Sequence, residues 1–163
     1  MNFGKINKAD IANGTGVRVS LFVSGCRNRC KGCFNPEAWS FSYGEPFTAD
    51  TVKEILKALA PDYISGLTIL GGDPMECENV VPVENLCRQV KSMYPDKTIW
   101  IYTGYSWEDV RHLPMMLYAD VLVDGRFIEA EKDLTLKFRG SRNQRIIDVQ
   151  KSSETKKVEL WRF

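Results

Sequence analysis

Residues 17–33 read VRVSLFVSGCRNRCKGC, a short apolar and β-branched run that leads directly into three closely spaced cysteines. The run Val17–Val23 predicts a buried strand, because residues of this kind pack well in a sheet and a glycine soon follows. The next loop carries Cys26, Cys30 and Cys33. The sequence therefore predicts a strand with a cysteine-rich loop at its carboxyl end.

Strand-like and helix-like segments alternate along the rest of the chain. Thr48–Ala60 predicts a helix, because its apolar residues recur at the 3.6-residue period and a proline follows. Further helices are expected within Val83–Met93 and over Ser106–Leu113. Further strands are expected at Leu67–Leu70, Thr98–Tyr102 and Asp120–Val123, with weaker candidates at Leu134–Phe138 and Arg145–Val149. This alternation predicts an α/β fold with a parallel sheet.

Glycine-rich or polar turns follow the expected strands. Gly71-Gly72-Asp73-Pro74 comes after the second strand, Thr103-Gly104-Tyr105 after the third, and Asp124-Gly125-Arg126 after the fourth. Because the carboxyl ends of parallel strands emerge at one edge of a sheet, these turns should lie beside the cysteine loop. The sequence therefore predicts one site at that edge.

The length of 163 residues indicates a single domain of reduced size. A closed eight-fold barrel takes about 250 residues, so we expect a partial, open parallel β/α barrel over residues 1–149. Residues 150–163 are expected to form a polar C-terminal tail, mobile over Gln150–Lys157, in which Val158–Trp161 can pair with a strand. An open barrel leaves the site exposed on one side, which favours a macromolecular substrate that closes the opening.

Charge and hydropathy exclude several classes of partner. The formal net charge is +1, so no overall field favours nucleic acid or an anionic membrane. No apolar run approaches the ~18 residues of a membrane span, and the first residues lack a signal-peptide pattern. We therefore expect a cytoplasmic protein. The odd count of five cysteines argues against a disulfide framework, and the single histidine, His112, leaves little for a catalytic triad.

The cysteine loop has the chemistry of a metal-cluster site. Thiolates are the normal ligands of iron–sulfur clusters, and this loop supplies three for the four irons of a cubane. If neither Cys77 nor Cys87 completes the set, one iron is open to an exogenous ligand. Gly25 and Gly32 allow the backbone to bend around a bulky group. Three nearby cations are expected to favour the deprotonated thiols: Arg27, Arg29 and Lys31.

A structural zinc site in a non-catalytic interaction module is the alternative. Such a site would take Cys77 or Cys87 as its fourth ligand. Zinc sites usually combine two Cys-x2-Cys elements, whereas here the first gap has three residues and no second pair exists. The spacing therefore favours an iron–sulfur cluster over zinc.

The Cys-x3-Cys-x2-Cys spacing, followed by the aromatic Phe34, resembles the signature of radical S-adenosylmethionine enzymes. The wider match looks like one subgroup, the activating proteins of anaerobic ribonucleoside-triphosphate reductases. It covers the chain from Phe3 to about Arg145. The segments that carry it are Asn13–Gly16 with Arg18, Ser24–Cys26, Cys33–Asn35, Gly71–Pro74, Trp100 with Thr103–Tyr105, Val121–Gly125 and Arg139–Ser141.

The resemblance implies a 4Fe-4S cluster on Cys26, Cys30 and Cys33, with S-adenosylmethionine on the open iron. An electron from a reduced flavodoxin-type carrier would cleave this cofactor to methionine and a 5′-deoxyadenosyl radical. That radical would take hydrogen from a glycine Cα of the reductase large subunit and leave a glycyl radical there. A short radical enzyme with a different substrate, either a small molecule or another glycyl-radical enzyme, is the alternative within this chemistry.

The resemblance also assigns the residues that would bind S-adenosylmethionine. Gly32, Cys33 and Phe34 would contact the adenosyl group, and Gly71 and Gly72 would run along the methionine moiety. The wider superfamily usually has Glu after these glycines, where this chain has Asp73, and this side chain is the candidate partner of the ligand's ammonium. The basic segment Arg139–Arg145 would dock the reductase, reach the cofactor carboxylate, or form a solvated loop.

Overall fold

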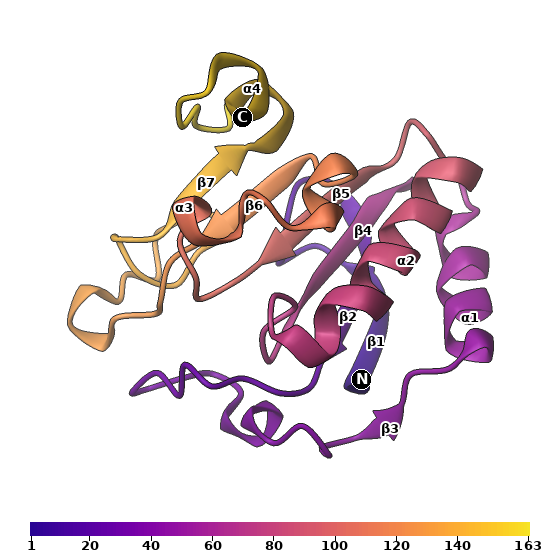
Figure 1. Cartoon of the computed structure of the whole chain (residues 1–163), viewed down its shortest axis with the longest axis horizontal. Coiled ribbons are helices and arrows are strands. Elements are labelled where there is room, and N and C mark those ends of the chain that lie inside the picture. The colour runs from indigo at the N-terminus through magenta and orange to yellow at the C-terminus, as the bar shows by residue number, and fades with distance from the viewer.

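The computed structural model describes residues 1–163 as a mixed α/β fold on one seven-stranded sheet (Figure 1). The strand order is β3-β1-β2-β4-β5-β6-β7. The four central strands are parallel neighbours: β2 (Val17–Val23), β4 (Ile64–Gly71), β5 (Thr98–Tyr102) and β6 (Val121–Asp124). Antiparallel strands extend both sides: β1 (Asn2–Asp10), β3 (Glu45–Pro46) and β7 (Arg145–Asp148). The predicted parallel sheet is therefore confirmed in its centre, and the sheet remains open.

Two long helices pack on one face of the sheet, where Figure 1 shows them side by side. They are α1 (Ala49–Leu59) and α2 (Cys77–Met93). Helix α1 begins at a capping box in which the Thr48 side chain accepts from the Thr51 N–H. The shorter helices are α3 (Trp107–Val110) and α4 (Val149–Thr155), with 3₁₀ turns η1 (Pro36–Trp39), η2 (Pro114–Leu117) and η3 (Glu129–Glu131).

Alternation along the strands divides the sheet into two unlike faces. The face under α1 and α2 is the main core, and its strand residues include Val19, Leu21, Leu67 and Ile69. The other face has a smaller cluster built on Trp100, Val121, Val123 and Ile146. Phe138 and Trp161 pack against this second cluster, so the region between β6 and β7 and the C-terminal residues cover it.

The C-terminal residues are more ordered than the sequence indicates. The stretch expected to be mobile contains α4, which begins where the Asp148 side chain accepts from the Lys151 N–H at 3.0 Å. The expected pairing of Val158–Trp161 is confirmed, because Leu160 forms an antiparallel bridge with Ile147. These contacts attach the tail to the second face of the sheet.

Two other expectations differ from the structure. Leu134–Phe138 is an irregular turn and not a strand, since Phe138 takes a left-handed φ of 55° and Leu134 is 82% exposed. Helix α2 begins at Cys77 and continues through Pro82, although a proline usually marks a boundary. No helix of the structure is both long and apolar enough to cross a bilayer.

Candidate functional site

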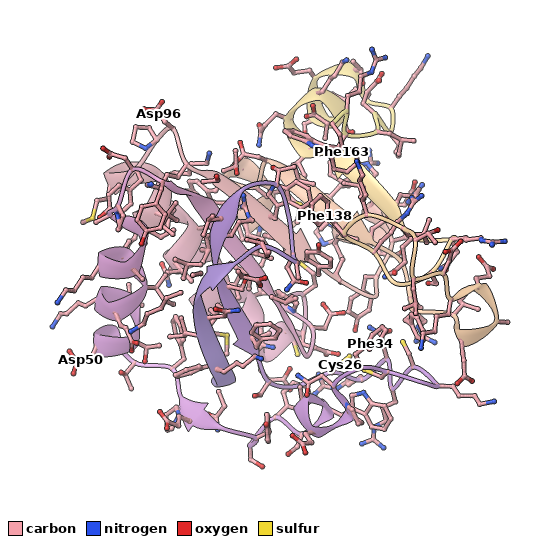
Figure 2. All side chains as sticks on the ribbon, turned by 180° about the vertical axis from the view of Figure 1, so that it is seen from behind. Cys26, Phe34, Asp50, Asp96, Phe138 and Phe163 are labelled. Carbon is pink, nitrogen blue, oxygen red and sulfur yellow. The ribbon has the colours of Figure 1, made fainter.

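A cavity of about 620 Å³ lies at the carboxyl ends of the parallel strands. Every loop predicted to meet there contributes to it: the cysteine loop after β2 and the turns after β4, β5 and β6. The region 125–144 between β6 and β7 forms another wall. Figure 2 shows Cys26 and Phe34 at this end of the sheet, well away from Asp50 and Asp96. The predicted convergence of these loops is therefore confirmed.

The three loop cysteines, Cys26, Cys30 and Cys33, all line this cavity and are partly buried. Backbone hydrogen bonds hold their loop in place: the Gly25 N–H donates to Ala38 O at 2.8 Å and the Cys26 N–H to Trp39 O at 3.2 Å. The φ angles of 96° at Gly25 and 74° at Gly32 confirm that these turns need glycine.

The two remaining cysteines lie outside the cavity lining. Cys77 is exposed at the start of α2, where its thiol donates to the Glu78 carboxylate at 3.0 Å. Cys87 is fully buried in the main core, and burial strongly raises the pKa of its thiol. Neither cysteine shares the cavity with the loop cysteines, although the Cys77 thiol lies 4.0 Å from Arg27 Nη1.

Two of the three cations expected around the thiols are paired with carboxylates instead. Arg27 pairs with Glu76 at 2.6 Å and also with Glu78, so its charge is neutralised by α2. Lys31 lies 3.3 Å from Glu129. Burial raises the pKa of the Cys26 thiol, and its backbone hydrogen bonds oppose this only in part. A bound cluster would supply positive charge beside the Cys26 thiolate.

Both glycines of the turn after β4 line the cavity, and internal packing also requires them. Gly71 has a φ of 113°, and a Cβ added to it would lie 2.5 Å from Val23 O. A Cβ at Gly72 would lie 2.5 Å from Gly25 O and 2.8 Å from Ala38 O. These two positions bring the turn against the backbone that leads into the cysteine loop.

Gly72→Ala should therefore displace the cysteine loop. The added methyl meets rigid backbone oxygens and not a flexible side chain, so we expect a loss of about 1–3 kcal/mol in stability. Thermal unfolding and iron content after anaerobic reconstitution would measure the two effects. Gly4→Ala is the control, because its Cβ would meet the edge of the Tyr43 ring, away from the cavity. Equal iron content in Gly72→Ala and wild type would contradict this account.

Asp73 is a buried connection between the loops and not a free carboxylate. Its Oδ1 accepts from the Met75 N–H at 3.0 Å and from the Thr103 hydroxyl at 2.8 Å. Its Oδ2 accepts from the Gly104 N–H at 2.8 Å and from the Asn28 side chain at 3.0 Å. Burial raises the pKa of this carboxyl to about 6, although the hydrogen bonds lower it. Asp73 thus joins the turns after β4 and β5 to the cysteine loop.

The sequence analysis missed Asn28, which lies between two of the cysteines and lines the cavity. Its Nδ2 donates to Asp73, and its Oδ1 accepts from Arg126 Nε at 2.9 Å. A Cβ at Gly104 would lie 2.5 Å from Asn28 Nδ2, so a larger residue there would displace the Asn28 side chain. The asparagine between the cysteines is the only sequence signal, and it does not reveal partners this far along the chain.

Phe34 and Gly32, which flank Cys33, differ in whether they line the cavity. Phe34 lines the cavity, is 70% exposed and packs against Phe127 with ring centroids 5.5 Å apart. Gly32 is outside the cavity lining, and a Cβ there would lie 2.9 Å from Glu129 Oε1. The predicted adenosyl contacts on either side of Cys33 thus differ in their access to the cavity.

The residues of this cavity fit a cluster and a medium-sized organic ligand. No three His, Cys, Asp or Glu side chains gather closely enough to hold a single metal ion. In a four-iron cluster each thiolate binds a different iron, so its ligands surround the cluster and do not converge on one point. The volume lies within the ~300–1,000 Å³ of ligand pockets. Tyr102 also lines the cavity, and its buried hydroxyl has no hydrogen-bond partner within the chain.

Comparison with known proteins gives the same kind of centre. A family model described as a 4Fe-4S single cluster domain matches residues 12–147. A protein of Enterobacteria phage T4 is 45% identical over 148 residues, which cover 90% of this chain and 93% of the phage protein. A protein of Vibrio cholerae is 43% identical over 88% of this chain and 96% of its own length, and one of Escherichia coli is 38% identical over the same shares. All three are named anaerobic ribonucleoside-triphosphate reductase-activating proteins.

The region that the family model matches contains the candidate site. The matched region contains the cysteine loop, the turns after β4, β5 and β6, and the whole wall formed by region 125–144. From this identity over nearly its whole length, the chain belongs to the family of anaerobic ribonucleoside-triphosphate reductase-activating proteins and contains a 4Fe-4S single cluster domain.

Proposed function

We propose that this protein acts in the cytoplasm to activate an anaerobic ribonucleoside-triphosphate reductase by radical S-adenosylmethionine chemistry. The observation that carries the proposal is the position of Cys26, Cys30 and Cys33 in one cavity with the turns after the other parallel strands. In this proposal residues 1–149 are a small radical S-adenosylmethionine half-barrel, and residues 150–163 are an appended tail. Family membership supports the reductase as partner.

The cysteines would hold three irons of the cluster and leave the fourth for the cofactor. When bound, the cluster would supply the electron that cleaves S-adenosylmethionine, so that a 5′-deoxyadenosyl radical removes hydrogen from a glycine of the reductase. The backbone of Gly71 and Gly72 would lie along the methionine part of the ligand. Asp73, held by four donors, would orient the surrounding loops and present its charge towards the ligand's ammonium.

The shape of the site supports a protein substrate. The sheet ends at β3 and β7 without closing, and the region 125–144 forms only one wall of the cavity. Phe34 and Leu134 line the cavity yet remain 70% and 82% exposed. A docking protein would cover these side chains and exclude water, as radical chemistry requires.

The test mixes the anaerobically reconstituted protein with the reductase, a reduced flavodoxin and S-adenosylmethionine. We expect a glycyl radical signal in electron paramagnetic resonance, with methionine and 5′-deoxyadenosine formed together. Omission of S-adenosylmethionine should abolish the signal, and so should omission of the flavodoxin. A protein that binds zinc in place of iron, or one that consumes the cofactor without forming a reductase radical, would overturn the proposal.

A further inference from the structure

Arg139 is the only Lys or Arg among the residues that line the cavity. Two carboxylates share this lining, and both are already engaged. Asp73 accepts four hydrogen bonds, and Asp133 lies 3.1 Å from Arg142 and also accepts from Thr135. Arg139 has no carboxylate within ion-pair distance, so the cavity contains one cation without an ionic partner.

The structure holds Arg139 in place while leaving most of its donors free. Its Nη1 donates to Gln144 O at 2.8 Å, and its guanidinium makes no other hydrogen bond in the chain. The Gln144 side chain fixes the same turn, because its Oε1 accepts from the Gly140 N–H at 2.9 Å and its Nε2 donates to Gly125 O at 2.9 Å. Arg139 is therefore partly buried and preorganised beside the end of β6.

The backbone immediately before Arg139 is strained, and this conformation allows Arg139 to line the cavity. Phe138 has a left-handed φ of 55°, which is a costly conformation for a bulky residue. Its ring packs on Trp100, with ring centroids 5.6 Å apart. With this bend the consecutive residues Phe138 and Arg139 both line the cavity, whereas successive residues of a strand would point to opposite sides.

The other two arginines of the segment Arg139–Arg145 already form ion pairs with carboxylates. Arg142 is 72% exposed and pairs with Asp133. Arg145 pairs with Asp124 and Glu108, and Asp124 also accepts from the Trp107 N–H at 2.7 Å. These contacts tie β7 to β6 and α3. Within this segment the structure thus separates one arginine that lines the cavity from two that hold the fold.

We propose that Arg139 binds the α-carboxylate of S-adenosylmethionine, an assignment that rests on the proposed function. The ligand carries an ammonium, a sulfonium and a carboxylate, and only the carboxylate attracts a guanidinium. Arginine matches a carboxylate with paired donors in one plane, and partial burial strengthens that contact relative to water. The same chemistry would accept a carboxylate side chain from the reductase, so the experiment must separate the two sources.

The experiment compares wild type and Arg139→Met in the anaerobically reconstituted protein, with S-adenosylmethionine and with its decarboxylated analogue. We expect Arg139→Met to weaken binding of the complete ligand about 10- to 100-fold. Binding of the analogue should change less than about twofold, because it lacks the group that Arg139 contacts. The ligand-induced change in the reduced cluster's paramagnetic resonance spectrum should need correspondingly more S-adenosylmethionine.

Arg142→Met is the matched control, because it removes the same charge from the same turn outside the cavity lining. It should bind both ligands as wild type does. If Arg139→Met does not retain iron, Arg139→Lys takes its place, with an expected loss of about 3- to 10-fold for the complete ligand alone.

The possible failures are distinguishable. Equal weakening of both ligands would overturn the assignment and give Arg139 a structural role. Unchanged binding of both, with weaker binding of the reductase, would also overturn it and give the carboxylate to the partner protein. If wild type itself bound no S-adenosylmethionine, the proposed function would fail, and not only the role of Arg139.

Discussion

Single replacement of Cys26, Cys30 or Cys33 by serine should leave the protein without an intact 4Fe-4S cluster and without detectable activation of the reductase. All three thiols line one cavity, and no other cysteine of the chain lines it. A hydroxyl is a poor substitute for the soft thiolate that iron–sulfur clusters prefer. Iron and sulfide analysis after anaerobic reconstitution, together with the absorption spectrum, measures the loss.

Cys77→Ser and Cys87→Ala are the matched controls for this series. Cys77 is exposed and contacts Glu78, while Cys87 is enclosed by the main core, where a serine hydroxyl would be buried among apolar side chains. Both variants should bind as much iron as wild type. Loss of the cluster on changing either residue would show that the chain supplies a fourth ligand, and the open iron would have to be abandoned.

Asp73→Asn should destabilise the protein by about 2–4 kcal/mol near neutral pH. The carboxylate accepts from four donors in a buried position, and an amide would turn its own N–H groups towards some of them. Urea unfolding of the metal-free protein would measure the loss. Asp96→Asn is the control, because this aspartate is exposed and lies far from the site in Figure 2. A variant as stable as wild type would contradict the role of Asp73 as a connection between loops.

The effect of Asp73 should also depend on pH. Burial raises the pKa of this carboxyl from 3.8 to about 6, so the folded state keeps a proton that the unfolded state has lost. That contribution to stability is complete below pH ~4 and is lost as the pH rises through ~6. The stability of wild type relative to Asp73→Asn should thus fall by about 2 kcal/mol between pH 4.5 and pH 7. A difference independent of pH would show that Asp73 is ionised throughout this range.

The sequence predicted the parallel centre of the sheet because its strands have strong local signals. Val17–Val23 and Thr98–Tyr102 have the same bounds in the prediction and in the structure. Strand β1 escaped prediction, since its sequence NFGKINKAD is mostly polar and five of its nine residues are exposed. Its strand conformation depends on pairing with β2, which the local pattern of β1 does not encode.

Helix α4 and the turn at Leu134–Phe138 also differ from what their local sequences predict. Helix α4 has a polar sequence, and contacts with β7, with the segment before β6 and with the C-terminal residues make it part of the fold. Leu134–Phe138 has the residue types of a strand, yet the packing of Phe138 on Trp100 and Phe163 bends it into a turn. Tertiary contacts overrode local preference in both cases.

By itself the sequence determined the cysteine loop and the edge of the sheet at which it lies. The spacing of the cysteines and the succession of strands along the chain can both be read directly from the sequence. Only the tertiary structure decided how the residues around that loop are used. In the folded protein Arg27 forms an ion pair at the start of α2, and hydrogen bonds of Asp73 and Asn28 join separate loops. Arg139 is left without an ionic partner. These roles depend on which charges and donors meet after folding, over separations in the chain that no sequence pattern spans.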